Sequence, residues 1–123
     1  MPKDREFQTF EEFWPFYIGE HRDPLCRKLH FIGSTCALGF VGAAVITGNP
    51  LLLIGAPVSG YGFAWVGHFI IERNRPATFT YPLWSLRGDA RMYGLMLRGK
   101  MDAEMTRYYG SAQPSRDAPL HVI

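Results

Sequence analysis

The sequence predicts an all-α membrane protein in which two transmembrane helices form a hairpin, flanked by amphipathic helices at the membrane interface. Residues 31 to 71 contain no Asp, Glu, Lys or Arg, so every residue of these four types lies in the flanks. Each apolar arm is close to the roughly 20 residues that cross the hydrocarbon core of a bilayer. Gly48-Asn49-Pro50 has the composition of a tight turn, so the two helices are expected to be antiparallel.

The composition limits the chain to one small domain and excludes one class of partner. The 123 residues carry a formal net charge of +2, and the basic residues are scattered along the sequence. Nucleic-acid binding requires a clustered basic patch, so we expect no nucleic-acid partner. Residues 1–110 are predicted to form a single helical membrane domain with the hairpin at about residues 24–73. Residues 111–123, which contain Pro and Ser, are predicted to be a disordered tail.

A short aromatic helix is predicted before the hairpin. Thr9 and Glu12 fit a capping box at its start. Pro15 lacks a backbone donor and is expected to kink the helix or make it start late. The aromatic residues that this helix would present are Phe10, Phe13, Trp14, Phe16 and Tyr17. Trp and Tyr are enriched at membrane interfaces, so the helix either lies in the interface or packs against the bundle.

The hairpin helices have clear boundary signals. Asp23 as N-cap and Pro24 as first helical residue start a helix that is predicted to run to Thr47. The return helix is predicted from Leu51 to about Arg73. The basic residues that flank the open end of the hairpin are Arg22, Arg27, Lys28, Arg73 and Arg75, and none lies in the turn. Basic residues mark the cytoplasmic side, so both termini are expected to be cytoplasmic.

The part of the chain after the hairpin is expected to contain an extended piece and further helices. Residues 77 to 81 are predicted to be extended. A helical stretch is expected over residues 82 to 97, with Gly88-Asp89 as an interruption. A last, polar helix is predicted from Lys100 to Tyr109, followed by a glycine that stops it.

Three of the four histidines fall at one end of the predicted hairpin. His30 lies near the start of the first helix, His68 lies near the end of the second, and His21 comes just before the first. Because the helices are antiparallel, the three positions meet at one membrane depth. Glu72 follows His68 by four residues, which on an α-helix places both side chains on one face. Ionisable side chains at this depth are expensive, so these residues form a functional-site hypothesis.

The residue types at this locus indicate a metal site. Neutral imidazole is a common metal ligand, and imidazole with a carboxylate but no thiolate suits ferrous iron, zinc or manganese. The composition alone does not choose among these metals. Further polar residues available to orient the imidazoles are Glu20, Asn74 and Asp89.

Two segments carry a resemblance to a known family. The first is FWPFYIGEHRDPLCRKLHFIGS, in which His21 and His30 are nine positions apart. The second is GYGFAWVGHFIIERNRPATF, which holds the pattern GH-x-x-x-E-x-x-x-P ending at Pro76. Over about residues 9 to 98, the chain resembles the family of small membrane proteins that includes the yeast endoplasmic-reticulum 2-hydroxy fatty acid dioxygenase. It is similar to a short bacterial member, which implies a bacterial inner membrane as its location.

The resemblance implies an iron-dependent activity. The family's reaction is an α-oxidation that shortens a 2-hydroxy fatty acid by one carbon with molecular oxygen and Fe(2+). Carried over to this chain, the catalytic and metal residues are His21, His30, His68 and Glu72. Members of the yeast type carry a histidine doublet where this chain has Glu20-His21. The partners implied are a fatty acyl substrate, oxygen and membrane lipid, and a homo-oligomer would cover the polar surface that a hairpin leaves.

The resemblance also places a substrate. Its 2-hydroxyl and carboxylate would chelate the iron, and its acyl tail would lie along Gly60 and Ala64 or between the hairpin and the aromatic arms. Arginine suits bidentate carboxylate binding, although membrane anchoring is the alternative role for these residues. The substrate candidates are Arg22, Arg73, Asn74 and Arg75. Two other functions stay open: a non-catalytic membrane assembly or lipid-binding protein, and a zinc-dependent lipid hydrolase.

Overall fold

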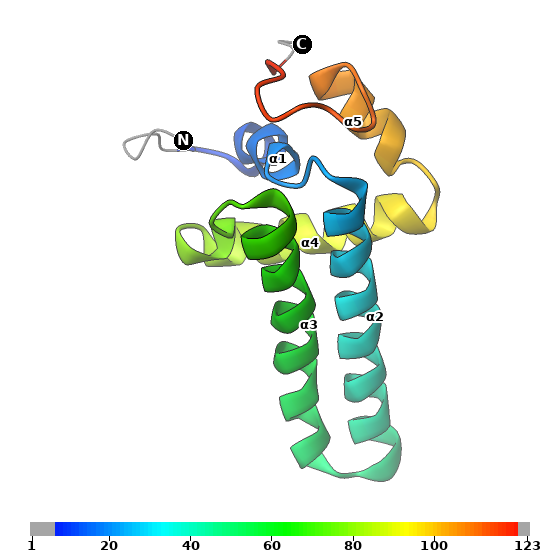
Figure 1. The fold of residues 1–123 in the computed structure, drawn as a ribbon. Helices are drawn as coiled ribbons and strands as arrows, with labels where there is room; N and C mark the ends of the chain where they lie inside the picture. The colour runs from blue at the N-terminus through cyan, green and yellow to red at the C-terminus, as the bar shows by residue number, and fades with distance from the viewer. Residues whose placement is uncertain (1–6, 121–123) are drawn as a thin grey trace.

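The computed structural model describes residues 7–120, and helices make up most of them. In chain order these are α1 (Phe10–Gly19), α2 (Pro24–Thr47), η1 (Pro50–Ile54), α3 (Gly55–Val66), η2 (Gly67–Glu72), η3 (Ala77–Phe79), α4 (Pro82–Leu97) and α5 (Met101–Tyr109). No β-strand occurs among the described residues, so the predicted all-α class is confirmed. Figure 1 shows a long hairpin of α2 and α3 that projects from a head made of α1, α4 and α5.

The hairpin forms with the predicted boundaries. The backbone N–H of Leu25 donates to the Asp23 side chain at 2.8 Å, so Asp23 caps α2 with Pro24 in the first turn. Gly48 ends α2 in the left-handed conformation with a φ of 72°. Asn49 then caps η1, which leads without interruption into α3 and η2. The start at Asp23 and Pro24 and the turn at Gly48-Asn49-Pro50 are as the sequence predicted, while the two caps within the turn are findings of the structure.

The hairpin exposes an extensive apolar surface. The segments Pro24–Thr47 and Pro50–Glu72 are long and apolar enough to cross a membrane. Their most apolar stretches of 18 residues have a mean hydropathy of 1.8 and 1.3, respectively. The rest of the chain buries only 17% and 6% of the residues in these stretches. A core helix of a soluble protein would be mostly buried. Ile46, for example, is 86% exposed and Leu51 is 71% exposed, so this surface requires an apolar environment outside the chain.

The head has an aromatic core of its own. Its buried members are Phe10, Phe13, Trp14, Tyr17, Ile18, Ala77, Met92, Met101, Met105 and Tyr109. The indole N–H of Trp14 donates to the Glu104 carboxylate at 2.7 Å, which joins α1 to α5. Helix α1 packs against both α4 and α5, and its place relative to the membrane interface stays a prediction. Thr9 is confirmed as the N-cap, because the N–H of Glu12 donates to its hydroxyl at 3.2 Å. The Glu12 carboxylate accepts from the backbone N–H of Gln8 at 3.1 Å, so the second bond of the predicted capping box goes to the residue before the cap.

Three local expectations differ from the structure in whole or in part. Of the two effects expected of Pro15, the late start does not occur, because α1 begins at Phe10, directly after the Thr9 N-cap. Residues 77 to 81 are not extended, because Ala77–Phe79 form a 3-10 turn. Gly88 does not interrupt α4; a Cβ atom there would lie 3.0 Å from the Tyr17 ring, so this glycine permits close packing of α4 on α1.

The segment after α5 folds back over the connection between α1 and α2. Residues 111–120 contain no helix or strand. Arg22 donates to the backbone carbonyls of Ser115 at 2.5 Å and Ala118 at 3.0 Å, and Arg27 donates to that of Ala112 at 2.7 Å. Residues 121–123 of the predicted tail lie outside the described part of the chain.

Candidate metal centre

Three buried histidines converge where the hairpin meets the head. His21 comes from the connection between α1 and α2, His30 from the start of α2, and His68 from η2. They are 1%, 6% and 3% exposed, and one ring nitrogen of each lies within 4.8 Å of the others. The rings meet edge to face with centroids 4.4, 4.5 and 4.9 Å apart. The convergence predicted from the antiparallel hairpin is therefore confirmed.

Backbone carbonyls orient two of the rings. His21 Nδ1 lies 2.7 Å from the carbonyl oxygen of Tyr17, and His30 Nδ1 lies 2.8 Å from that of Cys26. A carbonyl oxygen only accepts, so Nδ1 carries the hydrogen in both rings. In the neutral form, Nε2 is then the atom with the free lone pair.

Asn74 orients the third ring. Its Oδ1 lies 2.8 Å from His68 Nδ1, and its amide group donates to the Glu20 carbonyl at 3.0 Å, which settles which end of the amide faces the histidine. Arg73 takes the left-handed conformation, with a φ of 58°, between η2 and Asn74. This conformation is uncommon for a residue other than glycine. It brings the backbone N–H of Asn74 within 2.9 Å of the His68 carbonyl, so the turn holds Asn74 against its histidine.

The resulting donor set fits a cation. His21 Nε2 and His30 Nε2 are 3.1 Å apart. Because both rings carry their hydrogen on Nδ1, two lone pairs face each other, an arrangement that a bound positive ion stabilises. Burial, together with His30 and His68, lowers the pKa of His21 well below its ordinary value, which disfavours a proton in that role. Metal-bound histidines typically donate their other N–H to an oxygen, as all three do here.

Glu72 takes a different place from the three histidines. Its carboxylate accepts a hydrogen bond from the backbone N–H of Asp23 at 2.5 Å, at the start of α2. The shared face with His68 was predicted for an α-helix, but Gly67–Glu72 forms a wider π-helical turn, which changes the rotation between the two side chains. The group of ligand atoms within 4.8 Å, among the described residues, contains histidines alone. A ligand role for Glu72 stays a prediction, while its observed contact ties the two ends of the hairpin together.

Glu20 is also outside the group of ligand atoms. Its backbone carbonyl, rather than its side chain, takes part by accepting from Asn74. Burial raises the pKa of the Glu20 carboxyl to about 6. The described structure therefore gives no fourth ligand at this position.

Two adjoining cavities meet at the histidines. The inner one, with a volume of about 10 Å³, has room for an ion or a single water-sized group. The outer one is a groove of about 490 Å³ between α2, α3 and α4, within the range of small-molecule sites. The residues that line both are His30, Tyr61, Ala64 and Asp89. The remaining lining of the groove is mostly apolar and includes Gly60, so the groove contains both small residues that we predicted to flank an acyl tail.

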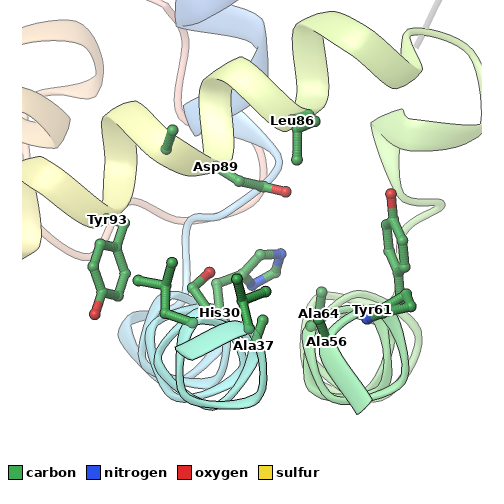
Figure 2. Close-up of a pocket in the computed structure, with 14 residues that line it drawn as sticks. His30, Ala37, Ala56, Tyr61, Ala64, Leu86, Asp89 and Tyr93 are labelled. Atoms are coloured by element: carbon green, nitrogen blue, oxygen red, sulfur yellow. The ribbon is translucent and has the colours of Figure 1, made fainter. Parts of the chain in front are cut away.

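Helix α4 supplies two polar groups to the inner cavity. Figure 2 shows the Asp89 side chain extending from α4 toward the hairpin, above His30. The Tyr17 hydroxyl donates to the Asp89 carboxylate, and burial raises the pKa of Asp89 to about 6. Ser85 also lines the cavity, and its buried hydroxyl has no hydrogen-bond partner in the described part of the chain. Such an unsatisfied group costs about 1–3 kcal/mol.

The predicted substrate arginines lie elsewhere. Arg22 bonds to backbone carbonyls and stacks over the Tyr109 ring at 4.5 Å, and Arg75 stacks over the Phe79 ring at 5.2 Å. Arg73 is exposed in its left-handed turn. None of the three lines either of the two cavities described above. The fourth candidate, Asn74, contacts a histidine instead.

Sequence reasoning missed part of this site. It did not assign Tyr17 or Ser85 to the site, and it named Asp89 only as a group available to orient an imidazole. The available signal was the spacing of four residues between Ser85 and Asp89, which places both on one face of a helix. A helix break at Gly88, as the sequence predicts, would separate the two residues and hide this spacing.

Comparison with known proteins agrees with the geometry. A model of the family described as 2-hydroxy-palmitic acid dioxygenase Mpo1-like matches residues 7–101. The match runs from the residues before α1 to the start of α5 and includes all three histidines. No curated protein and no solved structure matches this chain.

Proposed function

Because this chain belongs to the Mpo1-like family, we propose that it is an iron-dependent dioxygenase that shortens 2-hydroxy fatty acids by one carbon. The observation that carries the proposal is the set of three buried imidazoles, each with an oxygen acceptor at Nδ1. Imidazole ligation with open positions is compatible with non-haem iron. The apolar groove that ends at these rings supports a substrate with a long acyl chain.

The proposed reaction balances without an added reductant. A 2-hydroxy fatty acid and one molecule of oxygen give a fatty acid one carbon shorter, carbon dioxide and water. The bond between C1 and C2 breaks. C2 is oxidised from an alcohol carbon to a carboxylic acid carbon, and C1 leaves as carbon dioxide. Oxygen accepts all four electrons that the substrate loses. Ferrous iron held by the three histidines would supply the redox centre and the template for this exchange.

The chain's own residues position the reactants. Asn74 and two backbone carbonyls keep the three Nε2 lone pairs directed inward, so the ligands need little reorganisation when an ion binds. The acyl tail occupies the groove along Gly60 and Ala64, with its polar end toward His30. The apolar walls exclude water from the reacting end, which strengthens electrostatic interactions there.

The proposal includes the location of the protein. The exposed apolar arms support a hairpin that crosses a bacterial inner membrane. The basic residues at its open end and their absence from Gly48-Asn49-Pro50 support cytoplasmic termini. Because both arms of the hairpin line the groove together with α4, a membrane-dissolved fatty acid would reach it from the bilayer.

Metal content and product analysis test this function together. Detergent-purified protein is loaded with ferrous iron without oxygen and then given oxygen and 2-hydroxypalmitate. We expect stoichiometric iron and an odd-chain fatty acid as product, both lost in His68→Ala. His121→Ala, outside the residues that match the family, is the control histidine and is expected to keep both.

Three results would contradict the proposal. Absence of an odd-chain product across a range of 2-hydroxy acids would rule out the assigned reaction. Zinc in place of iron, with lipid hydrolysis, would favour the hydrolase. A folded protein that binds no metal would favour the non-catalytic membrane protein.

A further inference from the structure

Two side chains of α4 face the histidine cavity without contacting the metal ligands by hydrogen bonds. Ser85 and Asp89 are four residues apart, so they lie one turn apart on the same face of α4. Both line the inner cavity. In the described part of the chain, neither one hydrogen-bonds to a histidine, and neither belongs to the group of ligand atoms. They are therefore available to a molecule bound beside the metal.

Ser85 differs from several other helical hydroxyl residues in the described part of the chain. Thr35, Ser59 and Thr106 each donate to the backbone carbonyl four residues earlier, at 2.7 to 2.8 Å. Ser85 is 1% exposed, yet its hydroxyl has no partner among the described residues. Native proteins rarely leave such a group unpaired, and its position on the cavity wall indicates that it serves a ligand.

One carboxylate oxygen of Asp89 is held by Tyr17, and the other is available to a ligand. The Tyr17 hydroxyl donates to Oδ1, which leaves Oδ2 for another donor. Gly88 allows this pairing, because a side chain there would meet the Tyr17 ring. Asp89 lines both the inner cavity and the groove. It thus lies where the polar end of an acyl chain in the groove would meet His30.

We infer that Ser85 and Asp89 bind the polar head of the substrate and select a 2-hydroxy acid over an unsubstituted one. The Asp89 carboxylate accepts a hydrogen bond from the 2-hydroxyl, and the Ser85 hydroxyl donates one to the substrate carboxylate. Two groups one helical turn apart suit substituents on the neighbouring carbons C1 and C2. A fatty acid without the hydroxyl leaves an oxygen of the half-buried Asp89 without that partner, and sites built around a hydroxyl discriminate strongly against analogues that lack it. This inference rests on the proposed function.

Binding without oxygen tests the inference apart from turnover. Calorimetry on the full-length, iron-loaded protein in detergent, kept anaerobic at pH 7.5, compares 2-hydroxypalmitate with palmitate. We expect wild type to prefer the 2-hydroxy acid by at least about tenfold, the scale of one hydrogen bond to a charged group. Asp89→Asn is expected to lose most of this preference, and Ser85→Ala to bind both acids about tenfold more weakly. Asp117→Asn, exposed after α5, is the control and is expected to behave as wild type.

Thermal unfolding and iron content accompany each variant. Ser85→Ala removes a hydroxyl without a partner, so its melting temperature is expected to equal or exceed that of wild type. If Asp89→Asn does not fold, Tyr17→Phe provides a second perturbation, because it removes the group that holds Asp89 and is expected to weaken the preference.

Two results would overturn the inference. The first is that the folded, iron-containing variants bind as wild type does. Ser85→Ala would bind both acids with wild-type affinity, and the Asp89 or Tyr17 variant would keep the wild-type preference for the 2-hydroxy acid. The other is loss of iron in Asp89→Asn, which would assign Asp89 to the metal. The inference alone fails if these variants bind as wild type while wild type still forms the odd-chain product. The proposed reaction alone fails if head-group selection behaves as expected and wild type forms no product when oxygen is admitted.

Discussion

Replacing Asp89 by asparagine is expected to stabilise the metal-free protein above pH 6 and to leave its stability nearly unchanged at pH 4. Burial raises the pKa of Asp89 from 3.8 to about 6, against the opposing effect of the Tyr17 hydroxyl bond. Between these values the folded protein keeps the proton and the unfolded chain releases it. The stability of wild type therefore falls as the pH rises from about 4 to 6, and the penalty is complete above that range.

The size of the effect follows from the pKa difference. About two pKa units at 1.36 kcal/mol each give a penalty on the order of 3 kcal/mol for ionised, half-buried Asp89. Asparagine carries no charge and still offers an oxygen to the Tyr17 hydroxyl, so it removes the penalty and keeps the contact. For a domain of this size, 3 kcal/mol corresponds to a shift in melting temperature on the order of 10 °C.

Thermal unfolding of chelator-treated protein in detergent, from pH 4 to pH 8, measures this effect. The histidines titrate in both proteins, so their contributions largely cancel in the difference between variant and wild type. We expect that difference to be near zero at pH 4 and to grow to its full value by pH 7. A difference that does not change with pH, or a wild type that is the more stable protein at pH 8, would show that the Asp89 carboxylate is not desolvated and would refute the reasoning.

Three further predictions concern the metal site, the hairpin and its orientation. Asn74→Ala is expected to lower metal affinity about 10- to 100-fold in a chelator competition, because His68 loses its acceptor, whereas Asn74→Asp keeps an oxygen there. Equal affinities for the two variants would contradict this role. Gly33→Ala is expected to cost about 1–3 kcal/mol in thermal unfolding, since its Cβ would lie 3.0 Å from a backbone oxygen of α3. Gly39→Ala, with nothing within 4 Å, is its control and is expected to be neutral or slightly stabilising. Asn49→Cys is expected to react with an impermeant maleimide on the outer face of spheroplasts, and reaction only after lysis would reverse the proposed orientation.

Local signals were sufficient to predict most of the hairpin. Asp23 and Pro24 define the start of α2 through side-chain and backbone chemistry within a few residues, and Gly48 defines its end through its left-handed backbone. Such signals depend on contacts within a few residues and not on distant parts of the chain. Gly88 shows their limit, because the same residue type can end a helix or admit a neighbouring ring, and the neighbour here belongs to α1.

The metal site was partly predictable for a related reason. An antiparallel hairpin brings the start of one arm to the end of the other, so the meeting of His30 and His68 followed from topology alone. The position of the Glu72 side chain did not follow from topology, because it depends on a π-helical turn that alters the rotation between neighbouring side chains. The contacts of the arginines did not follow from the sequence either, since their charge was visible there but their carbonyl and aromatic partners were not.

The amino-acid order alone accounts for the helical class, the apolar arms, the turn between them and the three histidines at one end. These features arise from interactions between residues close in sequence and from the simple geometry of a hairpin. Which polar groups face the histidines was decided by the packing of the head. Tyr17 and Asp89 are 72 positions apart, and they meet because α1 and α4 bury a shared aromatic core across the open end of the hairpin. Contacts between such distant residues depend on how whole helices pack, a property that no local pattern encodes.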